Sequence, residues 1–423
     1  MAINLDTSPA DTRRPDVLPR PVTAPIERPD NRRTSGRPTE PPARRRRHLR
    51  RDVFIDTTRA LGTLCVVLVH WLMPEATWYG ETLHIGNALG HEYAWVLTWV
   101  LQVLPLLFFA AGAAAAYQLA TTPDGRWLAT LGTRLRAIAR PVGAFVAAWA
   151  VAIPVLLLLG VPDSAVWRIA RMAPQLLWFL GVWVALIVVA PVFLRAWRRW
   201  RWAAMGTALT LPLAVDAVRF AAGAEQLAWA NLVLVWAVPF LAGIAYAADR
   251  LAGRRAPADA STWLLAGALA GLSAMALLVA EGPYPPSMIG MPGDPISNLG
   301  PPTAAIVAQA VMQVCAVLLA RTALVRWAAR RRGRAVVHTL ARHSMTIYLW
   351  HLTAMFAVVG VALLALDVTL PEPWSADWWA SRPTWFGAFV LVLALLVRVF
   401  GRFERPSSRR RQPRAATASI STS

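Results

Sequence analysis

Residues 56–70 read Asp56-Thr-Thr-Arg59-Ala-Leu-Gly-Thr-Leu-Cys-Val-Val-Leu-Val-His70 and lie in the first long apolar segment of the chain. An α-helix turns about 100° and rises about 1.5 Å per residue, so Arg59 and His70 would lie within roughly 20° of one face and roughly 16 Å apart along the axis. Asp56 shares this stripe. Charges inside a membrane helix are costly and normally face a bundle interior or a wet cavity, so the stripe is a candidate functional site. The pattern also fits an interfacial anchor, with Asp56 and Arg59 paired at one membrane edge and His70 in the opposite headgroup layer.

The chain as a whole is too apolar for a soluble protein. Of its 423 residues, 57% are hydrophobic and 16% are charged. Several apolar runs can cross a hydrocarbon core of about 30 Å, which takes about 20 helical residues. We predict an all-α fold, a polytopic membrane helix bundle with about ten transmembrane helices, multi-pass in the inner (plasma) membrane. The predicted spans are 53–73, 93–117, 138–160, 174–194, 203–222, 229–248, 262–281, 303–321, 341–366 and 384–401.

Polar, arginine-rich segments flank the predicted bundle. Residues 1–52 contain almost no aromatic or aliphatic runs, and such a segment cannot bury enough surface to offset the entropy of the chain. We therefore expect a disordered Arg/Pro-rich cytoplasmic tail at 1–52, a transmembrane domain at 53–401 and a disordered basic cytoplasmic tail at 402–423. The arginines directly before the first helix suit contact with anionic lipid.

The basic residues indicate orientation in a membrane rather than nucleic-acid binding. All 43 are arginine, and they gather in the tails and in alternate connections between spans. The arginine-rich connections are 126–136, 195–201, 250–255 and 321–334, whereas the alternate connections 74–92 and 282–302 contain no arginine. We therefore predict that both termini face the cytoplasm (N-in, C-in), with membrane lipid and no nucleic acid among the partners.

Two segments each allow two interpretations. Asp216 and Arg219 make 203–222 the weakest span, and we expect a snorkelling pair near a helix end more than a transport site. The Pro- and Gly-rich connection 282–302 can either cover a site or serve as a plain connector. Cys65 and Cys315 both lie in apolar segments and imply neither a disulfide nor a metal site.

The stripe on the first helix has the side chains for acid–base chemistry. Imidazole titrates near neutrality, so His70 in a cavity can take a proton from a hydroxyl nucleophile and return it to a leaving group. Arg59 can hold a carboxylate or phosphate, with Asp56 orienting it. Asp56 and Arg59 also fit a purely structural ion pair.

A cationic group opens the third span on its cytoplasmic side. Arg136 and Arg140 are four residues apart and would project from one helical face, and Arg134 adds a third charge. Two guanidinium groups on one face at a membrane edge suit a polyphosphate. Positive-inside topology would place arginines there as well, so both interpretations stay open.

The ninth span carries a polar face. Ser344, Tyr348 and His351 recur at spacings of four and three, which places them on one side of a helix. They fit interhelical hydrogen bonds. They equally fit a site in which Tyr348 or His351 lies beside His70 as an orienting or acceptor-binding group.

Taken together, these motifs resemble the integral membrane acyltransferase 3 family over about residues 53–401. The resemblance rests on Arg59-X10-His70 after Asp56, Phe108-Phe109-Ala-Ala-Gly112, Arg136-X3-Arg140, Leu177-Trp178-Phe179-Leu180, Phe240-Leu-Ala-Gly243 and Ser344-X3-Tyr348-X2-His351, in this order. It implies ten membrane helices and transfer of an acyl group, often acetyl, from cytoplasmic acyl-CoA to a hydroxyl of a sugar, glycolipid or other acceptor of the cell envelope or secondary metabolism. Acyl-CoA is then a co-substrate, and no bound cofactor or metal is expected.

The resemblance also suggests residue roles. His70 and Arg59, with Asp56 tuning the arginine, would serve catalysis. The acyl-CoA site would consist of Arg136, Arg140 and Arg134, and the acceptor or supporting residues would be Ser344, Tyr348, His351 and Trp178. The main rival is a transporter or flippase for a polar or lipid-linked solute, whose path the same charges would line. The chain lacks the paired, Gly/Pro-broken short helices in two matching halves that favour that alternative. A membrane scaffold recruited through the first tail would leave His70 unexplained.

Overall fold

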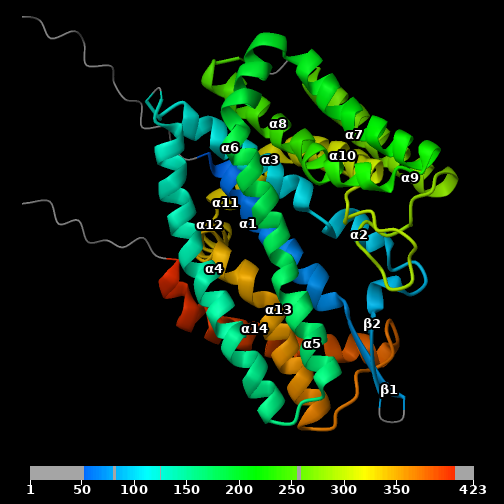
Figure 1. The fold of residues 1–423 in the computed structure, drawn as a ribbon. Helices are drawn as coiled ribbons and strands as arrows, with labels where there is room; N and C mark the ends of the chain where they lie inside the picture. The colour runs from blue at the N-terminus through cyan, green and yellow to red at the C-terminus, as the bar shows by residue number, and fades with distance from the viewer. Residues whose placement is uncertain (1–51, 80–81, 124, 255–258, 405–423) are drawn as a thin grey trace, which may run out of the picture. The chain divides into compact units, whose positions relative to one another are not determined.

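The computed structural model describes residues 52–79, 82–123, 125–254 and 259–404, so almost all of both predicted tails lies outside the described residues. The regular secondary structure of the described part is helical except for one hairpin of two short strands (Figure 1). The elements are α1 (Val53–Leu72), β1 (Pro74–Tyr79), β2 (Thr82–Asn87), α2 (Val96–Leu101), α3 (Leu104–Leu119), α4 (Trp127–Leu158), α5 (Asp163–Met172), α6 (Leu177–Trp200), α7 (Trp202–Ala222), α8 (Asn231–Leu251), α9 (Ala260–Glu281), α10 (Ala304–Leu319), α11 (Arg321–Ala329), α12 (Arg331–Arg342), α13 (Ser344–Leu364) and α14 (Ala376–Phe400), with short 3-10 turns at Ala88–Gly90, Ala173–Leu176, Glu225–Ala230 and Gly401–Phe403.

The predicted fold class is confirmed. In the described part, nine helical segments are long and apolar enough to cross a membrane, and a tenth results if α10 and α11, bent by 55°, count as one span. Each of the ten predicted spans overlaps one of these segments. The main differences are at the ends: α4 begins at Trp127 rather than near 138, α14 begins at Ala376 rather than near 384, and the connection 321–342 is itself helical.

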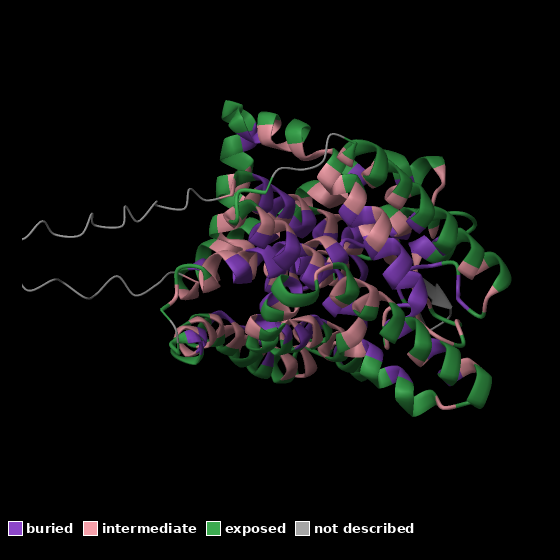
Figure 2. Cartoon of the chain, turned by 90° about the horizontal axis from the view of Figure 1, so that it is seen from above, coloured by how far each residue is buried: buried purple, intermediate pink, exposed green. Residues whose placement is uncertain are grey.

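The spans divide into inner and outer helices. About half or more of the most apolar window is buried in the segments of α1, α2 with α3, α8 and α13, for example 61% for the segment containing α8. In α9 the buried share is 11%, although its composition is equally apolar. Figure 2 shows this contrast as buried central ribbon surrounded by exposed helices. Apolar faces that the protein leaves uncovered are suited to contact with lipid.

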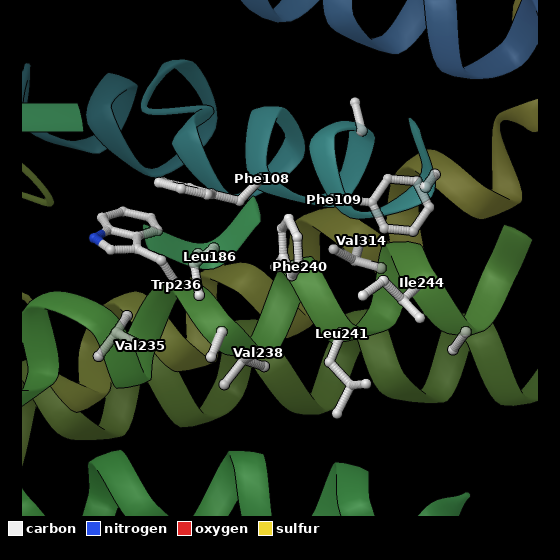
Figure 3. Close-up of a cluster of buried hydrophobic side chains, with 14 of the residues drawn as sticks. Phe108, Phe109, Leu186, Val235, Trp236, Val238, Phe240, Leu241, Ile244 and Val314 are labelled. Carbon is white, nitrogen blue, oxygen red and sulfur yellow. The ribbon is translucent and has the colours of Figure 1, made fainter. Parts of the chain in front are cut away.

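Two glycines allow a close backbone contact between α3 and α8. A Cβ on Gly112 would collide with the backbone carbonyl of Phe240, and a Cβ on Gly243 would collide with that of Phe109. Small residues let membrane helices approach until their backbones touch. Around this contact lie buried rings and aliphatic side chains (Figure 3), and Phe108 stacks on Trp236 with ring centroids 4.9 Å apart.

A second core joins α13 to α14 and α4. Phe145 packs edge-on against Trp350, and Trp350 stacks on Phe400 with centroids 3.9 Å apart. Just beyond α14, the Glu404 carboxylate accepts hydrogen bonds from the backbone N–H groups of Met345 and Thr346 and from the Thr346 hydroxyl. It therefore caps the N-terminus of α13, where a negative charge is favourable. The predicted tail boundary at 402 thus falls before a residue that contributes to the bundle.

The predicted second span is broken. Pro105 has no N–H to continue the helix, and the chain passes from α2 to α3 through Gln102 and Val103. Carbonyl groups at the end of α2 accept hydrogen bonds from two side chains of α10. Gln309 donates to Thr98 and Trp99, and Gln313 donates to Trp99 and Gln102 among others. This satisfies backbone groups that would be costly inside a membrane.

A cluster of polar contacts around Asp52 fixes the N-terminus of α1. The Asp52 carboxylate accepts hydrogen bonds from the Phe54 N–H and from the hydroxyls of Tyr117 and Tyr246, at 3.1, 2.7 and 3.1 Å. Arg250 lies 3.5 Å from the same carboxylate. Asp52 therefore caps α1 and ties it to α3 and α8 at once.

The predicted snorkelling pair at Asp216 and Arg219 is wrong. Both side chains are buried, and Asp216 accepts hydrogen bonds from Asn231, from the Tyr284 hydroxyl and from the N–H of Ala304. Arg219 pairs with Glu225 instead, at 2.7 Å. Burial and the Asp216 charge raise the pKa of Tyr284, which stays protonated and donates to the carboxylate. These contacts anchor both ends of the connection 282–303.

The α3–α8 contact generates a prediction about stability. We expect Gly243→Ala to destabilise the folded protein by about 2 kcal/mol or more, because overpacking costs about 1–3 kcal/mol even where side chains can move and here the obstacle is backbone. The matched control is Gly181→Ala in α6, where an added Cβ meets no atom within 4 Å. Thermal unfolding of the purified proteins in the same detergent measures both. Equal melting temperatures for the two variants would contradict the role given to this contact.

Candidate active site

Two histidines from distant segments meet at the centre of the bundle. His351 on α13 is fully buried, and its Nε2 lies 3.3 Å from Nδ1 of His70 on α1. The His70 Nδ1 is also 2.6 Å from the Val66 carbonyl oxygen, and the His351 Nδ1 is 2.7 Å from that of Tyr348. A carbonyl oxygen only accepts, so we assign the proton of each ring to Nδ1. This assignment leaves Nε2 of His70 with a free lone pair, the form that a general base needs.

The polar residues on α13 do not all lie at the cavity. Tyr348 packs against His351 and Phe179, and its hydroxyl donates to the Leu176 carbonyl at 2.8 Å. It therefore lies beside the histidine pair. Ser344 is the first residue of α13, one turn before Tyr348, and does not line the cavity next to His70.

A cavity of about 840 Å³ opens next to His70. On α1 its wall runs from Val66 to Met73, with His70 between them, and Tyr348 and Trp178 add an aromatic wall. The volume falls within the range of about 300–1,000 Å³ typical of small-molecule sites. Trp178 also contacts Phe179 and Trp236, so it connects the cavity to the main core.

Two connections cover the cavity. Ile289, Met291 and Leu299 line it, so the connection 282–302 is a cover rather than a plain connector. The Asn298 amide holds this cover in shape through the carbonyls of Pro285 and Ser287, at 2.7 and 2.8 Å. The second cover is the hairpin of β1 and β2, which the sequence analysis missed because a two-stranded hairpin inside a helical protein has only a weak local signal.

Arg59 lies toward the opposite end of α1 and outside the cavity. One of its terminal nitrogens is 3.5 Å from the Asp56 carboxylate, a long contact, and its Nε is buried without a hydrogen-bond partner among the described residues. Arg134 on α4 is close enough to Arg59 for the two charges to repel each other. Guanidinium groups that repel each other create a region of positive electrostatic potential, and a bound anion would relieve the repulsion.

The predicted cationic group on α4 splits into two faces. Because residues two and six positions apart differ by about 200° and 240° around a helix, Arg136 and Arg140 point away from the face of Arg134. Both are exposed, whereas Arg134 is half-buried. All three lie inside α4 rather than at its start. Arg134 thus lies within electrostatic range of Arg59, whereas Arg136 and Arg140 lie on another face of α4.

Gln102, at the break between α2 and α3, is a polar residue of the cavity wall that sequence reasoning missed. Its backbone carbonyl is satisfied by Gln313, but its side-chain nitrogen and oxygen are buried without a hydrogen-bond partner in the described part of the chain. A buried amide without a partner is uncommon, and a substrate can satisfy it. Pro105, just after Gln102, was the sequence signal for the break. Among the described residues, no group of three or more His, Cys, Asp or Glu side chains is placed to hold a metal ion.

Comparison with known proteins identifies the family. Residues 52–400 match the acyltransferase 3 family, described as an acyltransferase domain. The chain matches no curated protein and no solved structure. The matched region runs from the Asp52 cap to the end of α14 and includes both histidines. The chain therefore belongs to the acyltransferase 3 family, a family of membrane acyltransferases.

Proposed function

We propose that the protein transfers an acyl group, in the simplest case acetyl, from cytoplasmic acyl-CoA to a hydroxyl group of a sugar, a glycolipid or another envelope or secondary-metabolite acceptor. The observation that carries this proposal is the geometry of His70. Its Nδ1 is held by the Val66 carbonyl and His351, it lines the cavity, and its Nε2 lone pair remains for a substrate. A positioned imidazole on the wall of a cavity is what a general base for a hydroxyl requires.

The reaction that follows needs one base and one positioned donor. The acceptor oxygen attacks the thioester carbonyl carbon while its proton moves to Nε2 of His70. The tetrahedral intermediate then collapses, the carbon–sulfur bond breaks, and the proton returns from His70 to the leaving CoA thiolate. His351 touches His70 and acts as a positioning residue, since it keeps the ring in the required tautomer.

The donor would enter from the Arg59 end of α1. Arg59 and Arg134 supply adjacent positive charge for the phosphate groups of CoA, with Arg136 and Arg140 as further cationic groups on the exposed face. His70 lies about 16 Å from Arg59 along the helix axis, a separation that the long pantetheine arm of CoA can span. The phosphates would then stay with the arginines while the thioester reaches the imidazole.

A transporter or flippase for a polar or lipid-linked solute is the second candidate. The cavity and the broken α2–α3 segment fit it. The membership in an acyltransferase family and the ordered histidine pair favour the enzyme.

His70→Ala should abolish acyl transfer, because loss of a general base costs about 10²–10⁴ in rate. Release of CoA from labelled acetyl-CoA by purified protein in the presence of acceptor measures this. His338→Ala, which removes an exposed histidine of α12, is the matched control and should retain full rate. Normal transfer by a folded His70→Ala variant would remove His70 from the mechanism.

For the donor site, we expect Arg134→Ala and the double variant Arg136→Ala/Arg140→Ala to raise the KM for acyl-CoA at least several-fold. Arg→Lys should restore the affinity only in part, because lysine lacks the planar fork of guanidinium. Arg199→Ala, an exposed arginine near the end of α6, should leave the KM unchanged. If the double variant inserts with mixed topology but keeps its donor KM, the pair serves orientation alone.

Topology can be measured with a membrane-impermeant thiol reagent on intact cells that produce a Cys65→Ala/Cys315→Ala protein. Glu372→Cys should react and Arg199→Cys should not, since the proposal places Arg199 in the cytoplasm. The connections 74–92 and 282–302 contain two other candidate positions for a cysteine. Glu81 lies outside the described residues, and Asn298 is fully buried and would not be reached by the reagent. Reaction at Arg199→Cys without permeabilisation would place the arginine cluster outside and exclude a cytoplasmic donor.

A further inference from the structure

One face of α13 forms a long apolar wall of the cavity. From Tyr348 the wall continues through Leu352, Met355, Val359 and Leu363, and Phe356, Gly360 and Leu364 line the cavity beside them. Spacings of four and three keep the first row on one side of the helix, and the 15 residues from Tyr348 to Leu363 rise by about 22 Å. The wall therefore leads from the histidine pair along almost the whole remaining length of α13.

The opposite wall has the same character. On α5, Ala165, Ile169 and Met172 face the cavity at helical spacing. The charged side chains on the cavity wall are Glu75, on the hairpin, and Arg168, on α5, which lies 3.5 Å from the Ile85 carbonyl of the hairpin. The walls on α13 and α5 thus offer mainly aliphatic contacts, while polar side chains line the cavity at His70, at Gln102 and Gln175, on the connection 282–302 and at the hairpin.

This distribution restricts what can bind. Burial of a hydroxyl without a hydrogen-bond partner costs about 1–3 kcal/mol, so an apolar cavity disfavours a molecule with hydroxyls along its whole length. Burial of aliphatic surface gains about 25 cal/mol per Å². The cavity therefore matches a ligand that combines polar groups with an aliphatic part.

We propose that the acceptor is an amphipathic alcohol: its reacting hydroxyl lies at His70, its aliphatic body lies between α13 and α5, and a second polar part lies at Glu75 and Arg168. The proposal rests on the proposed function and names the acceptor class of the same site. The acyl chain of the donor is the other possible source of an aliphatic body. It ends in a methyl group and cannot hydrogen-bond to Glu75 or Arg168, whose contacts are His91 and the Ile85 carbonyl. An acceptor with a second polar part can use these groups, so the acceptor is the better occupant.

Gly360 offers a direct way to shorten the cavity. It lies on the α13 wall, and an added Cβ there meets no atom within 4 Å, so a larger side chain can occupy the cavity without displacing backbone. Gly387 on α14 is the matched control, because a Cβ there also meets no atom within 4 Å and Gly387 does not line the cavity. Gly360→Leu and Gly387→Leu therefore add the same volume in a membrane helix, in one case inside the proposed site.

The binding experiment uses the full chain in phosphatidylcholine nanodiscs and a dodecyl β-glucoside that carries a photoactivatable diazirine in its alkyl chain. We expect crosslinks to map to α13 and α5, with competition by dodecyl β-glucoside at least tenfold stronger than by methyl β-glucoside. Gly360→Leu should reduce crosslinking at least tenfold and Gly387→Leu less than twofold. Both variants face the same membrane, so partition of the probe into lipid cancels in the comparison. Gly360→Ala, a smaller change, should give an intermediate reduction and covers the case in which Gly360→Leu fails to fold.

Two results would overturn the proposal: crosslinking that the Gly360 variants leave unchanged, or crosslinking that palmitoyl-CoA displaces while dodecyl β-glucoside does not, which would assign the cavity to the acyl chain. The crosslinking needs no turnover, so it remains readable if no acyl transfer occurs. Transfer of labelled acetyl from acetyl-CoA, compared between dodecyl and methyl β-glucoside, is then a separate measurement. Crosslinking as expected with no transfer to either glucoside would contradict the proposed function and leave the ligand class intact.

Discussion

The backbone contact between α3 and α8 is the constraint on which the site depends. Because Gly112 and Gly243 let the two helices touch, Phe108 reaches Trp236, and Phe108 in turn packs 4.8 Å from Phe179. Phe179 contacts Tyr348, and Tyr348 contacts His351. A continuous series of ring contacts therefore runs from the glycine contact to the histidine pair. Protein interiors are close-packed, so a displacement at one end of such a series is felt at the other.

In the proposed function, the two demands of acyl transfer are divided between the two ends of α1. Charge is concentrated near Arg59 and Arg134, and the aliphatic cavity lies beyond His70. The histidine pair stands at the boundary. In the proposed reaction this separation keeps the polyanionic part of the donor away from apolar walls, and the apolar walls keep bulk water away from the reacting thioester, which reduces its hydrolysis.

Much of the architecture follows from local sequence. Long apolar runs predict the spans, because a segment of about 20 apolar residues has few alternatives to a membrane helix. Because α1 is one continuous helix, Arg59 and His70 lie on one stripe as their spacing predicts. His351 lies beside His70 as one interpretation of the ninth span expects, and the role of each residue stays a prediction. The same rule of spacing places Arg134 and Arg136 on different faces of α4. The prediction from sequence treated the three arginines as one group and did not apply this rule.

The remaining features depend on partners far away in the chain. The break after α2 is stable because Gln309 and Gln313 lie opposite it, and Asp216 is buried because Tyr284 and the N–H of Ala304 meet it there. Asp52 is another case, since the tyrosines that bind it come from α3 and α8. Hydrophobic patterning carries no information about such long-range polar pairs.

Because the contacts of Asp52 fix the N-terminus of α1, the number of residues in α1 determines where His70 lies. One end of the helix is fixed by Asp52, and the other end must present His70 to His351. One inserted or deleted residue between them would turn His70 by about 100° and shift it by about 1.5 Å relative to the fixed end, while a substitution would leave the register intact. In evolutionary terms, the number of residues between Asp52 and His70 is therefore more constrained than the identity of the apolar residues among them.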